Sequence, residues 1–397
     1  MTYASTRCSR RPGRRLGIVL AGFALVLAAA AGGAGAVAHP RAMSTTTSPN
    51  PGPINYLRGV TAISPDDVWA VGMTQDRASR SMTLHWDGSA WTHVASPSPG
   101  TTSTYLSDVS AAATDDVWAI GDSLSPGTPW RSFAIHWNGA DWTRFSTPNP
   151  SARQTHLSAV STVSPSDAWA VGYYIPNGGS TEAAKTLVLH WDGVSWARVP
   201  SQNGGLGWNA LNDVAAITPT DLVAAGWFGW SGTSRVLALD GPSWTRAFPP
   251  TAGLGSVEAI GASSTSDVWF VGDDLDQELM IHWDGTSWSR SEPSPDLSRP
   301  ELYGVAATSP DDAWAVGVVQ EFGPTRTLLQ HWDGTEWTRI ASPNPGGLGD
   351  SNLWDVTATS ASDAWAVGDY LRIAADGSNH GWRTLILHWD GASWTRM

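Results

Sequence analysis

The sequence has 397 residues, of which 25 are Trp, 41 are Gly and 15% are charged, a composition that excludes a disordered polyelectrolyte. The formal net charge of −13 argues against nucleic acids and anionic membrane surfaces as partners. So many Trp residues indicate either a repeated core position or an aromatic binding surface.

Residues 1–38 have the parts of a secretory signal peptide. Five arginines precede an apolar run, Leu16–Ala31, that is too short to span a bilayer comfortably, and small residues then offer a cleavage site after Ala38. We therefore expect a secreted, extracellular protein. Export can follow general secretion or the twin-arginine route, which the pair Arg10-Arg11 leaves open.

Cleavage at this site changes the mature chain in two ways. It removes Cys8, the only Cys, so no disulfide can form and packing alone must stabilise the fold. It also takes the formal charge from −13 to −18, because five arginines and no acidic residue leave. No later apolar run is long enough to cross a membrane, and we expect a monomer.

Residues 55–397 contain seven copies of one unit, each about 45 to 54 residues long. Each unit has an apolar leader, a Trp in a "VWAVG" segment, and an "HWDG" segment that is followed by a further Trp. Unit four departs, with Val223, Ala238 and Leu239 in the places of Trp, His and Trp. The units begin near Leu57, Leu106, Leu157, Leu211, Val257, Leu302 and Leu353.

Four strand signals, A to D, follow one another in each unit. In the first unit they are Leu57–Ile63, Val68–Gly72, Met82–Trp86 and Trp91–Ala95, separated by segments such as "SPDD" and "DGSA" that are typical of turns. Strand C alternates apolar and polar residues. Four strands per unit, seven units and no helix signal predict an all-β fold, a seven-bladed β-propeller with four antiparallel strands per blade.

The loops between these strands differ in how much their lengths vary. The leader lies 12 residues before the strand B position, and the His position lies 6 residues before the next Trp, in all seven units. By contrast, the gap from Gly to His across the B–C loop is 13 residues in unit one, 10 in unit five and 20 in unit seven. The B–C and D–A loops share one face of a propeller, and we expect binding on that variable face.

The two ends of the chain complement one another. The last unit ends at "WTRM", without the "SPNPG" text that follows "WTRIA" in the preceding unit, and this text appears instead at Ser48–Gly52. We therefore expect residues 39–54 to be a linker that docks beside the last blade and closes the ring.

The repeated side chains are interpreted as scaffold. The Trp residues supply core packing, and the six His residues stand in separate blades, where they cannot converge on one metal ion, so each is expected to be buried with a hydrogen-bond partner. The Asp before each strand B is expected to bond backbone N–H groups of its own turn. A unique site must then lie where the repeat is broken.

The pattern "DVWAVG…LHWDGxxW" resembles the secreted bacterial β-propeller repeats that are loosely grouped with kelch, sialidase-type Asp-box and galactose-oxidase-like propellers. The resemblance covers the chain from Leu57 to its end and implies a propeller fold. It implies little about activity, because the Gly-Gly doublet of kelch repeats is missing from strand B and the Cys–Tyr crosslink of galactose oxidase is impossible after Cys8 is cleaved.

Aromatic residues outside the repeat mark a candidate ligand site. Trp227, Phe228 and Trp230 lie in the B–C loop of unit four, and Trp208 precedes them on the same face, as a stacking platform for sugar rings would require. Alternatively, Trp227 or Trp230 folds inward and fills the space vacated at positions 223 and 239.

A second aromatic group is expected near the mouth of the central channel. Tyr303 and Trp354 stand next to strand A leaders, as do Tyr56 and Tyr105. Charged residues expected near the same mouth are Arg58, Asp108, Asp213, Glu258, Glu301 and Asp355.

The shortest B–C link contains an acidic segment, "DDLDQE". Asp274, Asp276 and Glu278 alternate there, so in one strand they would share a face and could hold Ca²⁺ through carboxylate oxygens. A solvated acidic edge is the alternative, and no other cofactor is expected.

Two functions remain open at this point. The first is a secreted, non-catalytic propeller that binds a glycan, a cell-wall polymer or an extracellular protein through its variable loop face. The second is an extracellular polysaccharide hydrolase or lyase with its site at the channel mouth, although no nucleophile–base motif is found. The enzyme would require two or more carboxylates, or a His, with strongly shifted pKa values at the mouth.

Overall fold

The computed structural model describes residues 47–397, except 179–182, 230–234, 242, 248–254, 275–276, 295–296, 321–322 and 375. The described residues form 28 strands in seven four-stranded antiparallel sheets. They contain no helix, and hence no helix that could cross a membrane. The signal peptide expected at residues 1–38 lies outside the described residues.

Each sheet is built from four strands that are consecutive in the chain. The first sheet has β1 (Ile54–Ser64), β2 (Asp67–Gln75), β3 (Ser79–Trp86) and β4 (Trp91–Val94). The second has β5 (Ser103–Ala113), β6 (Asp116–Leu124), β7 (Arg131–Trp137) and β8 (Trp142–Ser146). The third has β9 (Thr155–Ser164), β10 (Asp167–Tyr174), β11 (Lys185–Trp191) and β12 (Trp196–Val199). The fourth has β13 (Trp208–Ala216), β14 (Leu222–Gly229), β15 (Arg235–Asp240) and β16 (Thr245–Ala247). The fifth has β17 (Ser256–Ser264), β18 (Asp267–Asp274), β19 (Gln277–Trp283) and β20 (Trp288–Arg290). The sixth has β21 (Pro300–Ser309), β22 (Asp312–Val319), β23 (Arg326–Trp332) and β24 (Trp337–Arg339). The seventh has β25 (Ser351–Ser360), β26 (Asp363–Ile373), β27 (Asn379–Trp389) and β28 (Trp394–Arg396).

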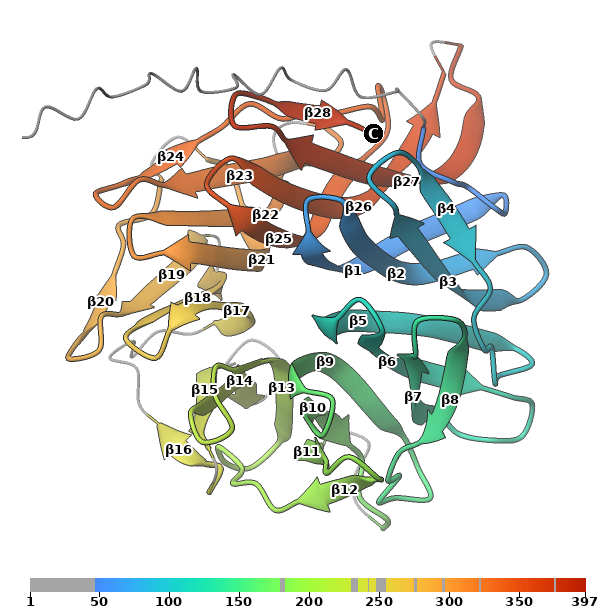
Figure 1. Ribbon diagram of the computed structural model, residues 1–397, viewed down its shortest axis with the longest axis vertical. Coiled ribbons are helices and arrows are strands. Elements are labelled where there is room, and N and C mark those ends of the chain that lie inside the picture. Colours follow the sequence, from blue (N-terminus) through green and yellow to red (C-terminus); the bar gives the residue numbers. More distant parts are fainter. Residues whose placement is uncertain are drawn as a thin grey trace, which may run out of the picture. The chain divides into compact units, whose positions relative to one another are not determined.

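The sheets close into a ring around a central axis (Figure 1). The first strand of each sheet packs against the first strand of the next, and β25 packs against β1. The register is repeated as well: the leader Leu57 pairs with Gly72, and Trp69 pairs with His85. The all-β propeller with four-stranded blades is therefore confirmed.

The Trp on the second strand of a blade packs against aromatic rings of the following blade. Trp365 is fully buried and contacts His388 of its own sheet with ring centroids 4.1 Å apart. It also meets Trp86 and Trp91 of the first sheet at 5.4 and 5.5 Å. The equivalent residues Trp69, Trp118, Trp169, Trp269 and Trp314 are buried in the same way. The core role predicted for them is confirmed.

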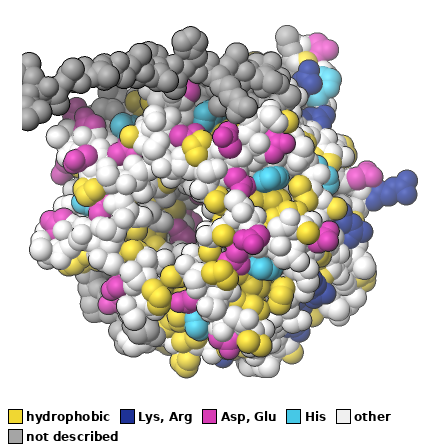
Figure 2. All heavy atoms as spheres, in the orientation of Figure 1, with side chains coloured by type: hydrophobic (Ala, Val, Ile, Leu, Met, Phe, Trp, Pro, Cys, Tyr) yellow, Lys and Arg dark blue, Asp and Glu magenta, His cyan; other side chains and the backbone are white. Residues whose placement is uncertain are grey.

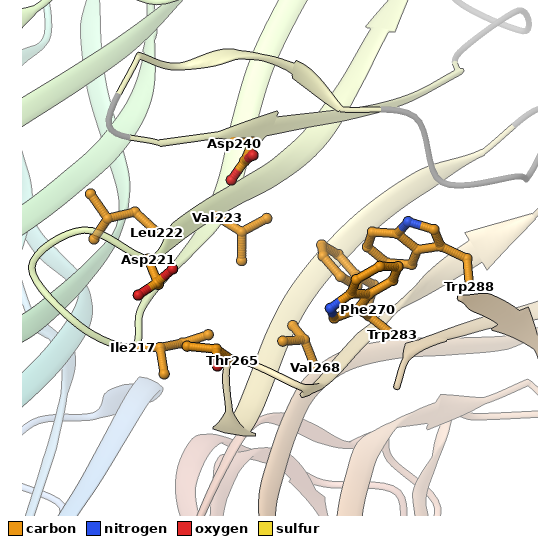
Figure 3. A pocket seen from close by; sticks show the side chains of 10 residues that line it. All are labelled: Ile217, Asp221, Leu222, Val223, Asp240, Thr265, Val268, Phe270, Trp283 and Trp288. Atoms are coloured by element: carbon orange, nitrogen blue, oxygen red, sulfur yellow. The ribbon is translucent and has the colours of Figure 1, made fainter. Parts of the chain in front are cut away.

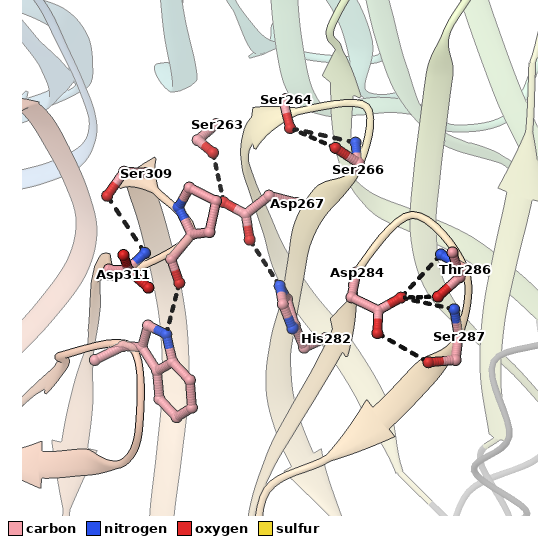
Figure 4. Close-up of polar contacts among 12 residues, drawn as sticks. Ser263, Ser264, Ser266, Asp267, His282, Asp284, Thr286, Ser287, Ser309 and Asp311 are labelled. Atoms are coloured by element: carbon pink, nitrogen blue, oxygen red, sulfur yellow. Dashed lines mark hydrogen bonds and ion pairs between the residues drawn. The ribbon is translucent and has the colours of Figure 1, made fainter. Parts of the chain in front are cut away.

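The prediction that the Asp before strand B bonds its own turn is wrong for six blades. In the fifth sheet, Asp267 Oδ1 lies 2.6 Å from Nε2 of His282 on the third strand (Figure 4). The reason is the strand alternation: the Asp precedes the Trp by two residues and shares its face, where the cross-strand partner of the Trp is the His. The other pairs are His85–Asp67, His136–Asp116, His190–Asp167, His331–Asp312 and His388–Asp363.

The prediction of seven blades built on one unit is corrected by the fourth sheet. Six sheets carry the complete Trp–His–Asp set, whereas in the fourth Val223 stands at the Trp position and pairs with Asp240. The sequence analysis put Ala238 at the His position. In the structure Asp240 holds that position, because it pairs with Val223 as the His pairs with the Trp in the other sheets. The hairpin is two residues shorter here, because Trp244 follows Asp240 by 4 residues instead of 6.

The N-terminal segment contacts the last blade. The Asn50 side chain accepts a hydrogen bond from the Thr384 backbone N–H at 3.0 Å and donates to the Thr384 hydroxyl at 3.1 Å, and Ser48 N–H donates to the carbonyl of Met397 at 3.3 Å. Within single blades the same contact is made between residues close in sequence, for example from Ser132 N–H to Asn149 at 3.0 Å. Residues 48–52 thus occupy the place of a D–A connection between the last blade and the first.

Replacing Asn50 with alanine is expected to lower the free energy of unfolding by about 1–3 kcal/mol, since two partners in a half-buried site lose their hydrogen bonds. The measurement is urea unfolding followed by Trp fluorescence. Asn138→Ala is the control, because Asn138 bonds only its own exposed hairpin turn. Equal effects of the two substitutions would contradict a closing role for Asn50.

Candidate functional site

The mouth of the channel is lined by positions that differ from blade to blade. In each sheet the residue before the leader pairs with the residue after the second-strand Gly, as in Tyr105↔Asp122 and His156↔Tyr173. The position before it is Gly in all seven sheets. No side chain fits there, because a Cβ on Gly72, for example, would lie 2.0 Å from a carbonyl oxygen of the neighbouring strand. The centre of the ring is open, with acidic side chains at its wall (Figure 2).

A row of half-buried rings runs along the second, third and fourth blades, and we call it the aromatic arc. Tyr173 stacks on His156 at 4.9 Å and meets Trp208 at 5.3 Å, and Trp208 is nearly parallel to Trp227 at 6.3 Å with an interplanar angle of 7°. Tyr105 and Trp130 extend the row beyond His156. The arc consists of Tyr105, Trp130, His156, Tyr173, Trp208 and Trp227.

A buried carboxylate fixes one end of this arc. Asp122 accepts a hydrogen bond from the Tyr105 hydroxyl at 2.9 Å, and its Oδ2 lies 2.8 Å from His156 Nδ1. Burial raises the pKa of Asp122, while the hydrogen bonds from His156 and Tyr105 act in the opposite direction. The carboxylate therefore holds two rings in a defined orientation, and His156 Nε2 is directed toward Gln154 at 3.5 Å.

The fifth and sixth blades contribute three neighbouring carboxyl groups, Glu258, Asp273 and Glu301. Burial, followed by repulsion from Asp273 and Glu301, raises the pKa of Glu258 to about 7. The Ser256 hydroxyl contacts both Glu258 and Asp273 but has a single proton to donate. The hydrogen bond that Ser256 donates to Glu258 acts against the rise in the pKa of Glu258, and burial outweighs it. Asn212 donates to the other oxygen of Glu258 at 2.9 Å.

The last and first blades complete the mouth with a cation–aromatic contact. The Arg58 guanidinium lies 4.0 Å from the ring centroid of Trp354, whose other neighbour is Tyr303 at 4.7 Å. The Trp354 indole N–H donates to Asp369 at 2.6 Å. Arg58 thus places a positive charge among the aromatic and acidic side chains of the mouth.

Three further aspartates lie deeper, on the channel wall, and connect neighbouring blades. Each accepts its following backbone N–H on one oxygen and an N–H of the next blade on the other: Asp108 from Val160 at 2.8 Å, Asp213 from Ile260 at 2.6 Å. Asp355 does the same with Val60 at 2.8 Å. Both oxygens have backbone partners, so these residues hold blades together and are poor candidates for acid–base chemistry.

The structure brings some predicted platform residues together and separates others. Trp208 and Trp227 are half-buried neighbours in the aromatic arc, and Tyr303 contacts Trp354 on the opposite side of the mouth. Phe228 instead packs over Gly204 and against the core between the third and fourth blades. Trp230 lies outside the described residues.

The residues proposed for Ca²⁺ are not placed as one ligand set. Asp274 ends β18 and forms an ion pair with Arg290 at 2.8 Å, whereas Glu278 belongs to β19 and is buried, accepting the Ser294 N–H at 2.8 Å. Asp274 and Glu278 stand on the two strands of one hairpin and not on a single strand, as the alternation had suggested. Asp276 lies outside the described residues. In the described ranges, no group of three or more His, Cys, Asp or Glu is arranged to hold a metal ion.

The sequence analysis predicted Glu258, Glu301 and Arg58 near the mouth of the channel. It did not predict Asp122, Asp273 and Asp369 there. All three missed residues follow the second-strand Gly, where the other sheets have Met, Tyr, Trp or Val. Comparing that one position across the units would have found them.

Comparisons with known proteins extend the fold assignment. No protein-family profile and no curated protein matches the sequence. Among solved structures, YCF48 bound to D1 peptide has a TM-score of 0.52 at 13% identity over 81% of this chain and 92% of that chain. YCF48 from Cyanidioschyzon merolae has a TM-score of 0.52 at 16% identity, over 87% and 98%. A PL25 ulvan lyase bound to -[GlcA(1-4)Rha3S]- has a TM-score of 0.53 at 7% identity, over 88% and 96%. At these identities the likeness shows the β-propeller fold alone.

Proposed function

We propose that the protein is an extracellular binding protein that holds a glycan or cell-wall polymer across the mouth of its channel. The observation that carries this proposal is the aromatic arc. Its rings follow one another at centroid distances of 4.9 to 6.3 Å, stay partly accessible, and are held by the Asp122 carboxylate. Sugar rings stack on flat aromatic faces of this kind, while nearby polar groups read their hydroxyls.

Other features of the mouth support an extended ligand. Trp354, Tyr303 and Arg58 lie on the opposite side from the arc, so a chain of several sugars would have contacts at both ends. Arg58 can pair with an acidic sugar. One similar propeller is bound to D1 peptide and another to -[GlcA(1-4)Rha3S]-. Because the first of these ligands is a peptide, an extracellular protein is the other partner class that we consider.

The raised pKa of Glu258 favours one further candidate, an extracellular polysaccharide hydrolase or lyase. A carboxyl group with a pKa of about 7 is partly protonated at neutral pH and can donate a proton to a leaving group. Glu301 and Asp273 beside it supply the second carboxylate that such chemistry requires. We rank this candidate second, because Glu258 already has hydrogen-bond partners on both oxygens.

The test is a binding titration of the mature protein with a panel of polysaccharides, followed by Trp fluorescence and by release of sugar ends. We expect saturable binding without release, and Trp227→Ala is expected to weaken it by about tenfold because one stacking contact is lost. Val194→Ala is the control, since Val194 is an exposed apolar residue on the opposite face. If sugar ends are released, and Glu258→Gln abolishes this release, the protein is an enzyme instead. If no polymer binds, an extracellular protein is the remaining partner class.

A further inference from the structure

A cavity of about 280 Å³ lies between the fourth and fifth blades, outside the channel mouth (Figure 3). Val223, Leu222, Asp221 and Asp240 line it from the fourth blade. Phe270, Trp283 and Trp288 line it from the fifth. Trp283 and Trp288 are half-buried, and both aspartates are exposed, so the cavity is reached from solvent.

The cavity exists because the fourth blade lacks one aromatic side chain. At the other well-described blade junctions the second-strand Trp packs against two Trp rings of the next blade, as Trp269 does on Trp332 at 5.0 Å and on Trp337 at 4.9 Å. Val223 holds that place in the fourth blade and leaves Trp283 and Trp288 without their partner ring.

The fifth blade compensates for only part of this loss. Phe270 stands where the other six sheets have Ala, and its ring reaches Trp288 at a centroid distance of 5.2 Å. The remaining volume lies close to the lower end of small-molecule sites, about 300 Å³. A flat aromatic ring therefore has the shape that would fill the remaining space between these walls.

The same blade also lacks one hydrogen-bond donor. In the six complete blades a His side chain contacts the carboxylate of the strand B Asp, as His282 contacts Asp267. In the fourth blade that Asp is Asp221, and the His position is occupied by a second carboxylate, Asp240. Burial and the nearby charge of Asp221 raise the pKa of Asp240. Two carboxylates thus stand where one carboxylate and its donor stand elsewhere.

We propose that this cavity binds an arylalkylamine, a small molecule with a flat aromatic ring joined by a short chain to a cationic amine. The ring takes the place of the missing Trp against Trp283, Trp288 and Phe270. The ammonium group lies between Asp221 and Asp240, where it supplies the donor that His supplies in the other blades. This site is independent of the channel mouth and of the ligand proposed there.

Tryptamine and indole-3-acetate test the proposal, because they share a ring and differ in the sign of their charge. Isothermal titration of the mature protein with tryptamine is expected to show saturable binding at one site, with indole-3-acetate bound at least roughly tenfold more weakly. Val223→Trp restores the repeated side chain and is expected to abolish tryptamine binding while raising the melting temperature.

A second variant keeps the test decisive if Val223→Trp does not fold. Asp240→Asn is expected to weaken tryptamine binding roughly threefold to fivefold, the range of a partly exposed ion pair, and to leave binding of neutral indole unchanged. Asp141→Asn is the matched control, since it removes one exposed charge near the corresponding hairpin of the second blade. Equal binding of the two indoles, tryptamine binding that Asp240→Asn does not change, or no saturable binding of tryptamine would overturn the proposal.

Discussion

Replacing Trp365 with alanine is expected to lower the free energy of unfolding by about 3–5 kcal/mol, the range for deleting a large buried aromatic side chain. Trp365 is fully buried and joins the last blade to the first through Trp86 and Trp91. Its loss removes contact area on both sides of the ring closure and leaves a cavity that the surrounding strands cannot fill. No disulfide can compensate for it, because Cys8 is the only Cys in the chain.

Urea unfolding monitored by circular dichroism measures this effect without relying on the altered Trp emission. Trp382→Ala is the control, since Trp382 is also an indole on the last blade but is only partly buried, against Tyr56. A loss of less than about 1.5 kcal/mol for Trp365→Ala, the range of an ordinary surface or half-buried change, would contradict the assigned role.

The second large effect is a loss of stability as the pH rises. Burial raises the pKa of Asp108 and of Asp213 to about 7, and it raises that of Asp355 well above its ordinary value. A carboxyl group with a higher pKa in the folded state binds its proton more tightly there than in the unfolded chain. Its contribution is fully present below the unfolded pKa of about 4 and is lost as the pH rises through about 7.

The free energy of unfolding is therefore expected to fall by at least about 2 kcal/mol between pH 5 and pH 8, because a tenfold difference in proton affinity between the folded and unfolded chain corresponds to about 1.4 kcal/mol. Exposed aspartates such as Asp87, whose pKa is lowered to about 2 by hydrogen bonds, act below this window. Urea titrations at several pH values measure the slope. Asp213→Asn should reduce that slope, whereas Asp141→Asn should not, and a stability that rises toward pH 8 would refute the assignment.

Much of the fold follows from spacing in the sequence, because the constant distances define hairpins. The leader and the strand B Gly pair directly, so the interval between them fixed the first hairpin of every blade in advance. The interval from His to Trp did the same for the last hairpin in six units. It failed in the fourth unit, where a shorter turn moved Asp240 into the His position and left Trp244 with a positive φ of 49°.

The candidate site was predictable only in part, for a physical reason. Residues beside the strand A leaders, such as Glu258 and Trp354, could be assigned to the mouth from their position in the unit. Their partners Asp273 and Asp369 come from the next strand, so finding them required the cross-strand pairing. The link between Val223 and Phe270 crosses two blades, and no spacing within one unit reveals it.

The way in which the ring closes has a consequence for how this protein can be rearranged. Each sheet is made from one continuous stretch of chain, and no strand is exchanged between the first and last blades. The seam between them consists of side-chain packing, the hydrogen bond from the Val60 N–H to Asp355, and the short segment that contains Ser48 and Asn50. Residues 48–52 thus join the last blade to the first much as a D–A loop joins any other two blades. A circular permutant that opens at one of these loops preserves every sheet, and duplication of a single unit inserts a whole blade without splitting a neighbour.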